Sequence, residues 1–340
     1  MATVALSGAA QRRSRVAPLD IILRYGTTTT AVATAAIVFL VALFLAIYAY
    51  PAIVFNGFGI LTHFEWNLGN QYGTGVERHG GFTGAPGASF GAFVFILGTL
   101  VSSALAMAIA TPLAILVAVA MHYRVPKQLK TPVNTLVELM AGVPSVVYGL
   151  WGVGVLVPWI ASTVGPFFSA HVPGVSFIGA GAASGNGLLA TGFILAVMIF
   201  PIMAATMRDV ISTFPTIIFE GAIGLGATPW QSVTTLVLPA IRTQMFAAAM
   251  LALGRAVGET MAVLMVCGSA LNQLPQTIFA PINTIAAVIV SQLDSALTDP
   301  TGMAERSLAE IALLLFAITL TVNLLARLIM RGGDRVKRTA

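Results

Sequence analysis

The chain has 340 residues, of which 57% are hydrophobic and 9% are charged, and its mean hydropathy is +0.92. Soluble domains average about 25% charged residues, so this composition excludes a soluble protein and indicates an integral membrane protein. The net charge of +5 does not indicate a nucleic-acid-binding protein, because the basic residues lie at the ends of apolar segments rather than along one face.

The apolar runs, taken in chain order, predict six membrane-spanning helices, since a helix needs roughly 20 mainly apolar residues to cross the hydrocarbon core. A basic segment, 1–28, precedes the first span, 29–53, which we interpret as an anchor rather than a cleaved signal peptide. A Gly-rich external loop, 54–90, follows. The core domain, 91–329, holds five more expected spans, near Phe93–Met121, Val137–Trp159, Leu189–Thr206, Gln244–Ser269 and Glu310–Leu328.

Two further segments of the core are expected not to cross. The run Ile282–Leu293 is apolar but too short, and we expect a short external or re-entrant helix there. The Gly/Ala-rich stretch 173–187 is expected to be a flexible linker. The expected fold class is therefore an all-α integral membrane protein with six transmembrane helices.

The distribution of basic residues predicts the orientation of these spans. The N-terminal segment, two alternate loops and the C-terminal end from Arg327 through the basic tail, 330–340, hold fourteen Lys and Arg residues, whereas the opposite loops hold two, Arg78 and Arg306. Cytoplasmic loops carry the excess of Lys and Arg. We therefore expect both termini in the cytoplasm. The one basic residue not in either set, Arg255, lies within an expected span.

Several kinds of chemistry are absent from the sequence. None of the three lysines follows a glycine, so the chain has no phosphate-binding loop of the G-x-x-x-x-G-K-[ST] type. The four histidines lie in separate segments without ligand spacing, and the single cysteine, Cys267, lies in an apolar run. We expect no metal, no cofactor and no catalytic residues in this chain, and interpret it as a transporter or channel subunit rather than an enzyme.

The loop between the fourth and fifth spans, about 208–242, is long for a simple connection. It offers a helical piece carrying Glu220, then Gly224 and Gly226, then a second piece that we expect to end at Leu238–Pro239. A helix lying on the membrane surface is one interpretation, but no Lys or Arg occurs between Arg208 and Arg242 to bind anionic lipid. A helix that docks into a partner's groove fits better.

The loop also carries a motif. Glu220, Gly221 and Ala222, then Gly226, Leu236, Leu238 and Pro239, resemble the E-A-A-x3-G-x9-I-x-L-P loop of importer-type ABC permeases, with Gly221 in place of the first alanine and Leu236 in place of isoleucine. The stretches GVPSVVYGLWG (142–152), MRDV (207–210) and GRAVGETMAV (254–263) narrow this resemblance to PstC-type permeases of phosphate ABC importers.

This resemblance implies a fold and a set of partners. It implies the ABC type-1 importer permease fold in a bacterial inner membrane. A PstA-like permease subunit would complete the pore, two copies of a PstB-like ATPase would bind ATP and Mg²⁺, and a PstS-like external protein would deliver phosphate. Glu220, Gly221, Ala222, Gly226, Leu238 and Pro239 would then form the loop that couples this chain to the ATPase.

Arg255 and Glu259 are the charged residues of the fifth expected span. With about 1.5 Å of rise per residue from Gln244, Arg255 would lie roughly 16 Å into the bilayer, where a charge costs roughly 2.5–3.5 kcal/mol on insertion scales. One interpretation is a structural pair at i and i+4. We favour a substrate path, because the Arg fork matches phosphate oxygens and Glu259 would prevent an anion from being trapped.

Thr260, Ser145 and Tyr148 are candidate hydroxyl donors along the same path. Three alternatives to a phosphate permease remain open: a PstA-like sister subunit, a permease for another oxyanion such as sulfate or molybdate, and a stand-alone channel or secondary transporter. The sister family usually has R-A-x-G-E-T-A-P, whereas Met261 and Ala262 follow the threonine here.

Overall fold

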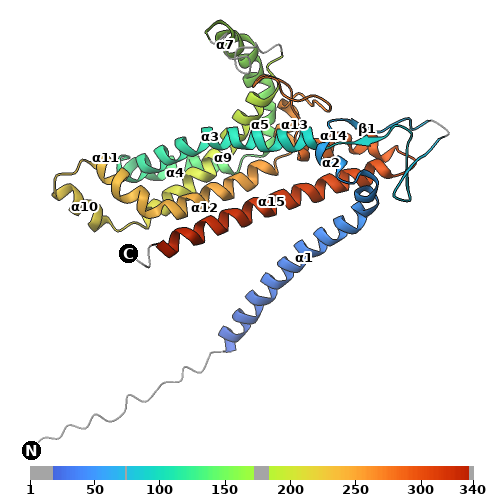
Figure 1. The fold of residues 1–340 in the computed structure, drawn as a ribbon. Coiled ribbons are helices and arrows are strands. Elements are labelled where there is room, and N and C mark those ends of the chain that lie inside the picture. The colour runs from blue at the N-terminus through green and yellow to red at the C-terminus, as the bar shows by residue number, and fades with distance from the viewer. Residues whose placement is uncertain (1–17, 73–74, 172–183, 337–340) are drawn as a thin grey trace, which may run out of the picture. The chain divides into compact units, whose positions relative to one another are not determined.

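The computed structural model describes residues 18–72, 75–171 and 184–336. The chain forms two compact units, residues 1–47 and 48–340. The described part of the first unit is the N-terminal portion of helix α1 (Pro18–Asn56), and the second unit contains the other described elements (Figure 1). Most of the expected linker 173–187 lies outside the described residues, as do the two ends of the chain, 1–17 and 337–340.

The second unit is built from helices, with four short strands among its described residues. In chain order its elements are α2 (Gly59–Thr62), β1 (Trp66–Asn67), β2 (Glu77–His79), β3 (Phe82–Gly84), β4 (Ser89–Phe90), α3 (Phe93–Tyr123), α4 (Lys127–Ala141), α5 (Ser145–Trp151), the π-helical turn η1 (Gly152–Leu156), α6 (Val157–Trp159), the π-helical turn η2 (Ile160–Val164), α7 (Gly165–His171), α9 (Leu188–Ser212), α10 (Thr216–Gly224), α11 (Pro229–Ser232), the π-helical turn η3 (Val233–Val237), α12 (Leu238–Val257), α13 (Met261–Val266), α14 (Ile285–Leu297) and α15 (Met303–Val336).

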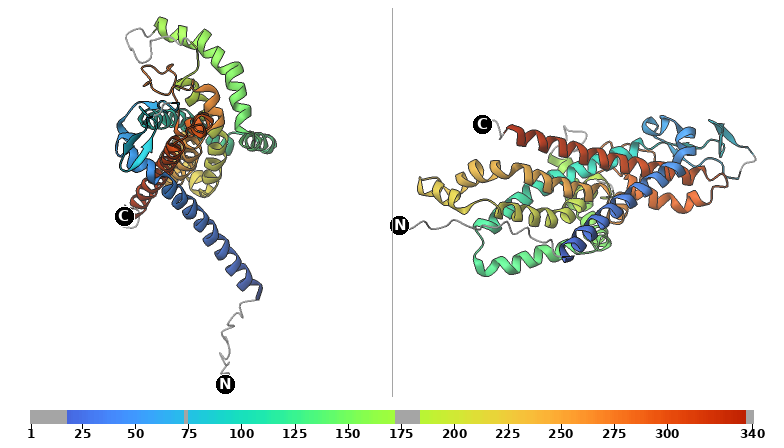
Figure 2. Two further views of the ribbon diagram at one scale, coloured as in Figure 1. Left: turned by 90° about the vertical axis from the view of Figure 1, so that its right-hand side faces the viewer. Right: turned by 90° about the horizontal axis from the view of Figure 1, so that it is seen from below.

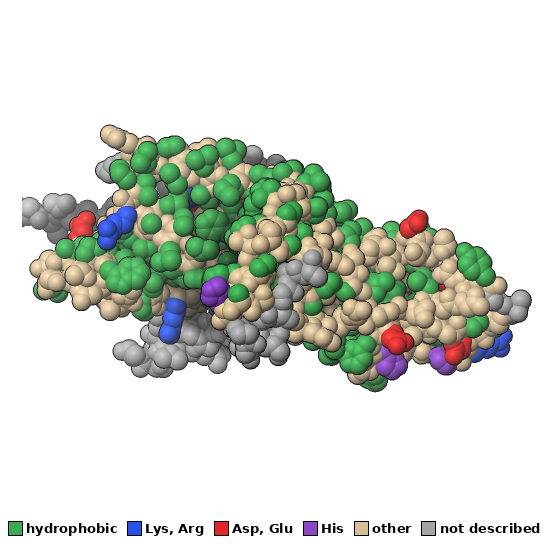
Figure 3. All heavy atoms as spheres, turned by 90° about the horizontal axis from the view of Figure 1, so that it is seen from above, with side chains coloured by type: hydrophobic (Ala, Val, Ile, Leu, Met, Phe, Trp, Pro, Cys, Tyr) green, Lys and Arg blue, Asp and Glu red, His purple; other side chains and the backbone are tan. Residues whose placement is uncertain are grey.

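Six helices within the described residues are long and apolar enough to cross a membrane, which confirms the expected fold class. They are Leu23–Asn56, Phe93–Tyr123, Ser145–His171, Leu188–Ser212, Pro229–Val257 and Met303–Leu328. The run expected to be too short to cross forms α14, a helix of 13 residues. Charged side chains lie toward the two ends of the face in Figure 3, with a band of apolar and uncharged side chains between them.

The centre of the second unit is the packing of α3 against α9. Ala106, Ala110, Ala114 and Ala118 follow one another at four-residue intervals along α3, and each is fully buried. Residues four apart share one face of a helix, and small side chains let helices in membranes approach closely. On α9, Gly192 likewise lets the two helices approach closely, because a Cβ at this position would clash with Leu105 of α3.

The third span differs from the sequence-based expectation of Val137–Trp159. Residues 127–141 form a separate helix, α4, and the span itself begins at Ser145 and continues to His171. Pro144 explains the division, because a proline disfavours helical backbone in the residue before it and cannot donate to the helix ladder. Glu138, expected inside the third span, therefore lies on α4.

The fifth span differs at both ends. Instead of running over Gln244–Ser269, the helix begins at Pro229 and ends at Val257. The expected helix end at Leu238–Pro239 is wrong, because the chain passes through Pro239 without a break.

Widened turns explain how the helices accommodate such prolines. The backbone N–H of Leu238 bonds to the carbonyl of Val233, five residues back, directly before Pro239. Val157 and Gly165 make the same π-helical bond directly before Pro158 and Pro166. A π-helical turn has room for the proline ring, which would collide with the carbonyl four residues back in a regular α-helix.

The segment expected as a Gly-rich external loop, 54–90, is partly ordered into two antiparallel strand pairs, β1 with β4 and β2 with β3. Trp66 and Phe90 lie with ring centroids 5.1 Å apart, and both belong to a second core with residues of α14 and α15. Glu310 of α15 is 6% exposed, and its Oε2 accepts a 2.7 Å hydrogen bond from Asn56 Nδ2.

The two ends of the second unit carry different elements. The loop of α10 and α11 and the C-terminal end of α15 lie toward one end, and the strands and α14 lie toward the other (Figures 1 and 2). Arg78 and Arg306, which the charge distribution assigned to the outer loops, belong to β2 and to the first turns of α15 at the strand end.

Candidate functional site

The charged stretch that the sequence singled out lies at a break in a helix. α12 ends at Val257 and the short helix α13 begins at Met261, so Gly258, Glu259 and Thr260 are not part of a regular helix. The expectation of one continuous helix through this stretch is therefore wrong. In a bilayer, non-helical backbone is tolerated only where protein buries it or where it lines a water-filled cavity.

Arg255 and Glu259 do not form the intrahelical pair that was one interpretation of their spacing. Both ion pairs among the described residues involve Arg208. Glu259 is half-buried, and its Oε1 accepts a 3.4 Å hydrogen bond from the backbone N–H of Ala262, within the first turn of α13. Arg255 lies in the last turn of α12 and is exposed in the isolated chain.

The end of α12 gives Arg255 a favourable local environment. The last carbonyl groups of a helix lack partners and carry a partial negative charge, which stabilises a nearby cation. This effect is typically about 0.3–1 kcal/mol at exposed sites. The expected depth of roughly 16 Å assumed a helix start near Gln244, whereas the span begins at Pro229 and Arg255 lies in its last turn.

Close packing brings α5 beside α13. A Cβ on Gly149 would lie 2.6 Å from Met265 Sδ and 3.1 Å from Ala262 Cα, so only a glycine fits between the two helices. A Cβ on Gly152 would lie 2.8 Å from Val266 Cγ1. These two glycines of the GVPSVVYGLWG stretch hold α5 against the helix that follows the break.

The candidate hydroxyl residues on α5 consequently lie near the break. The Oη of Tyr148 donates a 2.7 Å hydrogen bond to the carbonyl of Met140 at the end of α4. Ser145 is three residues before Tyr148 and shares its helix face. Thr260 lies within the break, and its Oγ1 donates a 3.4 Å hydrogen bond to the carbonyl of Gly258.

The residues near the break carry groups of the kind that an anion site uses. They combine one permanently charged guanidinium with uncharged hydroxyl groups, and the carboxylate of Glu259 is already engaged with backbone. An oxyanion would find bidentate donors at Arg255, while the nearby carboxylate disfavours tight retention. Among the described residues no group of three or more His, Cys, Asp or Glu side chains could hold a metal ion.

The other candidate residues lie at or before the opposite end of α12. Its first residue, Leu238, is about 26 Å along the helix axis from Arg255, at about 1.5 Å per residue. Glu220, Gly221 and Ala222 are on α10, which has no buried residue. Leu225 is 92% exposed. Gly226 follows in a turn with φ +94°, a conformation that favours glycine.

Two local interactions order the loop of α10 and α11. Phe219 of α10 stacks on Tyr123 at the end of α3, with ring centroids 4.3 Å apart. Thr228 and Gln231 form a reciprocal capping box at the start of α11, which satisfies two backbone N–H groups. Leu238 and Pro239 lie farther on, inside the continuous helix rather than at its end.

Sequence reasoning missed two features. The break at Gly258 has a weak signal, a glycine followed by Glu and Thr, residue types that often begin helices, but glycine is also common within membrane helices. The ion pair between Arg208 and Glu138 joins residues 70 positions apart, and nothing local predicts such a contact. Cys267, which lies in an apolar run of the sequence, forms no disulfide and is buried.

Comparison with known proteins now assigns the family. Residues 110–336 match the family model described as "Binding-protein-dependent transport system inner membrane component". The chain belongs to this family of transport-system permeases. Its similar relatives include "Phosphate transport system permease protein PstC 1" of Mycobacterium tuberculosis, 44% identical over 86% of this chain and 87% of that protein, and "Phosphate transport system permease protein PstC" of Pasteurella multocida, 37% identical over 81% and 80%.

The permease fold is also found among solved structures. A chain of the bacterial alginate ABC transporter, solved with an alginate-bound periplasmic protein, is 19% identical and covers 92% of this permease and 98% of its own length, with a TM-score of 0.51. At this identity the likeness concerns the fold alone. The permease therefore has the ABC type-1 permease fold, as the motif resemblance implied, and its family and six apolar helices make it a multi-pass membrane protein.

Proposed function

We propose that this permease is a pore-forming subunit of an ATP-driven importer of inorganic phosphate. The observation that carries the proposal is the break between α12 and α13, where Arg255, Glu259 and Thr260 lie at or beside open backbone and the helix that follows packs on α5, the helix of Ser145 and Tyr148. Such a break needs water or a partner around it. A water-filled path for an oxyanion would place water around the break. The PstC names of the relatives favour phosphate over sulfate or molybdate as that oxyanion.

The partners follow from the other end of α12. A PstB-like ATPase, in two copies, would bind ATP and Mg²⁺ and seat α10 in a groove. The large exposed apolar side chains on and beside α10, including Ile217 and Leu225, support docking there. A Cβ on Gly221 would meet nothing within 4 Å, so a requirement for a small residue at this position would come from a partner and not from this chain.

The remaining partners complete the path. A PstA-like subunit would cover the exposed side of Arg255, and a PstS-like protein would deliver phosphate at the end that carries the strands and α14. In a bacterial inner membrane, the docking loop and both termini would face the cytoplasm. ATP binding would draw the docking loops together and open the path outward, and hydrolysis would return it to the inward-open state.

Substitution of Arg255 tests the substrate role. Arg255→Gln is expected to lower phosphate uptake by at least about 30-fold, the effect of roughly 2 kcal/mol, the lower end of the range for removing one partner of a charged pair. The complex should still assemble. Arg242→Gln removes the same charge from an exposed position on the same helix and is the matched control, expected to leave uptake largely intact.

The measurement is uptake of labelled phosphate into vesicles containing the complex, together with ATP hydrolysis stimulated by phosphate or by sulfate. Unchanged uptake with Arg255→Gln would remove the substrate role. Equal stimulation by sulfate would remove the choice of phosphate, and uptake by this chain alone without ATP would show a stand-alone carrier instead.

A further inference from the structure

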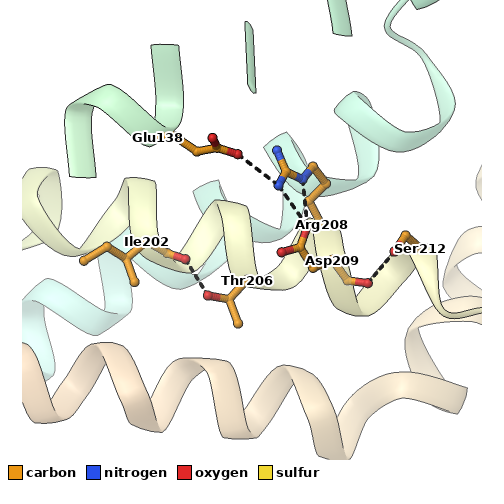
Figure 4. A network of polar contacts seen from close by, with 6 residues as sticks. All are labelled: Glu138, Ile202, Thr206, Arg208, Asp209 and Ser212. Atoms are coloured by element: carbon orange, nitrogen blue, oxygen red, sulfur yellow. Dashed lines mark hydrogen bonds and ion pairs between the residues drawn. The ribbon is translucent and has the colours of Figure 1, made fainter. Parts of the chain in front are cut away.

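An ion-pair cluster joins α4 to the end of α9, away from the candidate path. Arg208 Nη2 lies 3.4 Å from Glu138 Oε1 on α4 and 2.8 Å from Asp209 Oδ1, and Arg208 Nε donates a 3.1 Å hydrogen bond to the same Asp209 oxygen (Figure 4). The Arg208 side chain is 17% exposed, whereas those of Glu138 and Asp209 are 62% and 69% exposed. The guanidinium is thus held between the helices and its acidic partners are at the rim.

The cluster leaves hydrogen-bonding capacity unused. Arg208 Nη1 is buried without a partner, and so is Asn134 Oδ1. Asn134 is four residues before Glu138 and therefore shares its face of α4. A buried polar atom without a partner costs free energy, so a static clamp would be expected to satisfy these atoms. The unpaired donor on Arg208 and the unpaired acceptor on Asn134 instead allow α9 and α4 to exchange hydrogen-bond partners when one helix slides along the other.

The cluster is directly connected to the docking loop. Arg208 is one turn before the end of α9 at Ser212, and α10 begins at Thr216. The connection is tight, because the backbone N–H groups of Thr213 and Phe214 bond to the carbonyls of Val210 and Ile211. A force on α10 is therefore applied to the turn of α9 that holds Arg208.

The cluster is also connected to the candidate path. Glu138 is three residues before the end of α4 at Ala141, and α5 follows after the bend at Pro144. The hydrogen bond from Tyr148 Oη to Met140 O ties α5 back to α4. The next residue of α5, Gly149, packs against α13. A displacement of α4 is thus passed to α13, the helix that follows the break.

We propose that Arg208 is a positioning residue that couples the docking helix to the substrate path, by linking the end of α9 to α4 through Glu138. This inference rests on the proposed function, since it assigns the route by which ATP hydrolysis moves the path. Arg208 touches neither substrate nor ATP in this proposal. Its effect is on how much transport accompanies each hydrolysis event.

The test separates coupling from assembly. The complex is purified through a tag on this chain, reconstituted with its delivery protein, and assayed for phosphate transported per ATP hydrolysed and for the amount of co-purified ATPase. Glu138→Gln and Arg208→Gln are expected to lower the transport ratio by about threefold or more, within the range seen for substitutions along coupling networks. The co-purified ATPase should be unchanged.

Asp209→Asn is the matched control. Asp209 contacts the same guanidinium but lies on the same helix as Arg208, so it does not link α9 to α4, and its loss should leave the ratio unchanged. In the Asp209→Asn background, the swap Glu138→Arg with Arg208→Glu restores an opposite-charge pair across the two helices. This swap should return the ratio to within about twofold of wild type, as expected when two residues act as one coupled pair.

Three results would overturn the proposal. The first is an unchanged ratio with Glu138→Gln. The second is a loss of transport and hydrolysis in proportion to lost protein, which indicates a structural role only. The third is an Asp209→Asn effect as large as that of Glu138→Gln. Failure of the wild-type complex to hydrolyse ATP in response to phosphate would instead overturn the proposed function.

Discussion

The contact between α5 and α13 makes a quantitative prediction at Gly149. In Gly149→Ala the new methyl would lie 2.6 Å from Met265 Sδ and 3.1 Å from Ala262 Cα. The Met265 side chain is unbranched and can move, but the backbone at Ala262 moves only if α13 moves. Inserting a methyl into a packed contact typically costs about 1–3 kcal/mol.

Gly154 provides the matched control on the same membrane span. A Cβ there would meet nothing within 4 Å, so Gly154→Ala adds no clash. Replacing glycine by alanine inside a helix also contributes about 0.5–1 kcal/mol of stability through reduced chain entropy. This contribution is common to both variants. The difference in the free energy of unfolding between the two variants therefore isolates the clash, and Gly149→Ala should be less stable than Gly154→Ala by about 1–3 kcal/mol.

The assay is thermal unfolding of the tagged chain in detergent. In domains of 150–250 residues 1 kcal/mol shifts Tm by about 2–4 °C, so Gly149→Ala should unfold at least about 2 °C below Gly154→Ala. Phosphate uptake by the complex should fall with Gly149→Ala, because α13 would be pushed away from Tyr148. Equal Tm values and equal uptake for the two variants would refute the close contact between α5 and α13.

Two further predictions concern other parts of the chain. Gly221→Arg should leave the Tm of this chain unchanged, since a side chain there meets open space, but should reduce the ATPase that co-purifies; normal co-purification would contradict docking through α10. Glu310→Gln keeps an acceptor for Asn56 Nδ2 and should cost little, whereas Glu310→Leu leaves Asn56 Nδ2 with only its 3.2 Å bond to Ser307 Oγ and should cost about 0.5–1.5 kcal/mol, measured as the difference in Tm between the two; equal Tm values would show that the bond between Asn56 and Glu310 contributes nothing.

Hydropathy alone predicted the helices that cross, because a bilayer demands long apolar runs and the chain supplies them with little ambiguity. It failed where a helix changes course inside an apolar run. Val137–Trp159 looked like one span, and Pro144 was visible as an interruption, but whether a proline bends or divides a helix depends on its neighbours in space.

The candidate site shows the same limit. Arg255 and Glu259 were conspicuous as charges in an apolar sequence, yet their spacing indicated a shared helix face that the break at Gly258 removes. A glycine in a membrane helix is as often a packing residue as a hinge, and Gly149 is a packing residue in this chain. The contact of Arg208 with Glu138 depends on how α4 folds back on α9, which no local pattern encodes.

The widened turn η3 fixes the direction in which Arg255 points. Each residue of an α-helix rotates the chain by about 100° and advances it by about 1.5 Å, and η3 departs from that rotation once, ahead of Pro239. A π-helical turn takes one residue more than an α-helical turn for nearly the same rotation, so if all five residues of η3 became regular α-helix the rest of α12 would rotate by roughly 100° relative to the docking loop. The guanidinium would then face a different neighbour, although the apolar length of the helix and its charge would hardly change. The direction in which the charge points is thus set about five to six turns away, in a stretch of five uncharged residues.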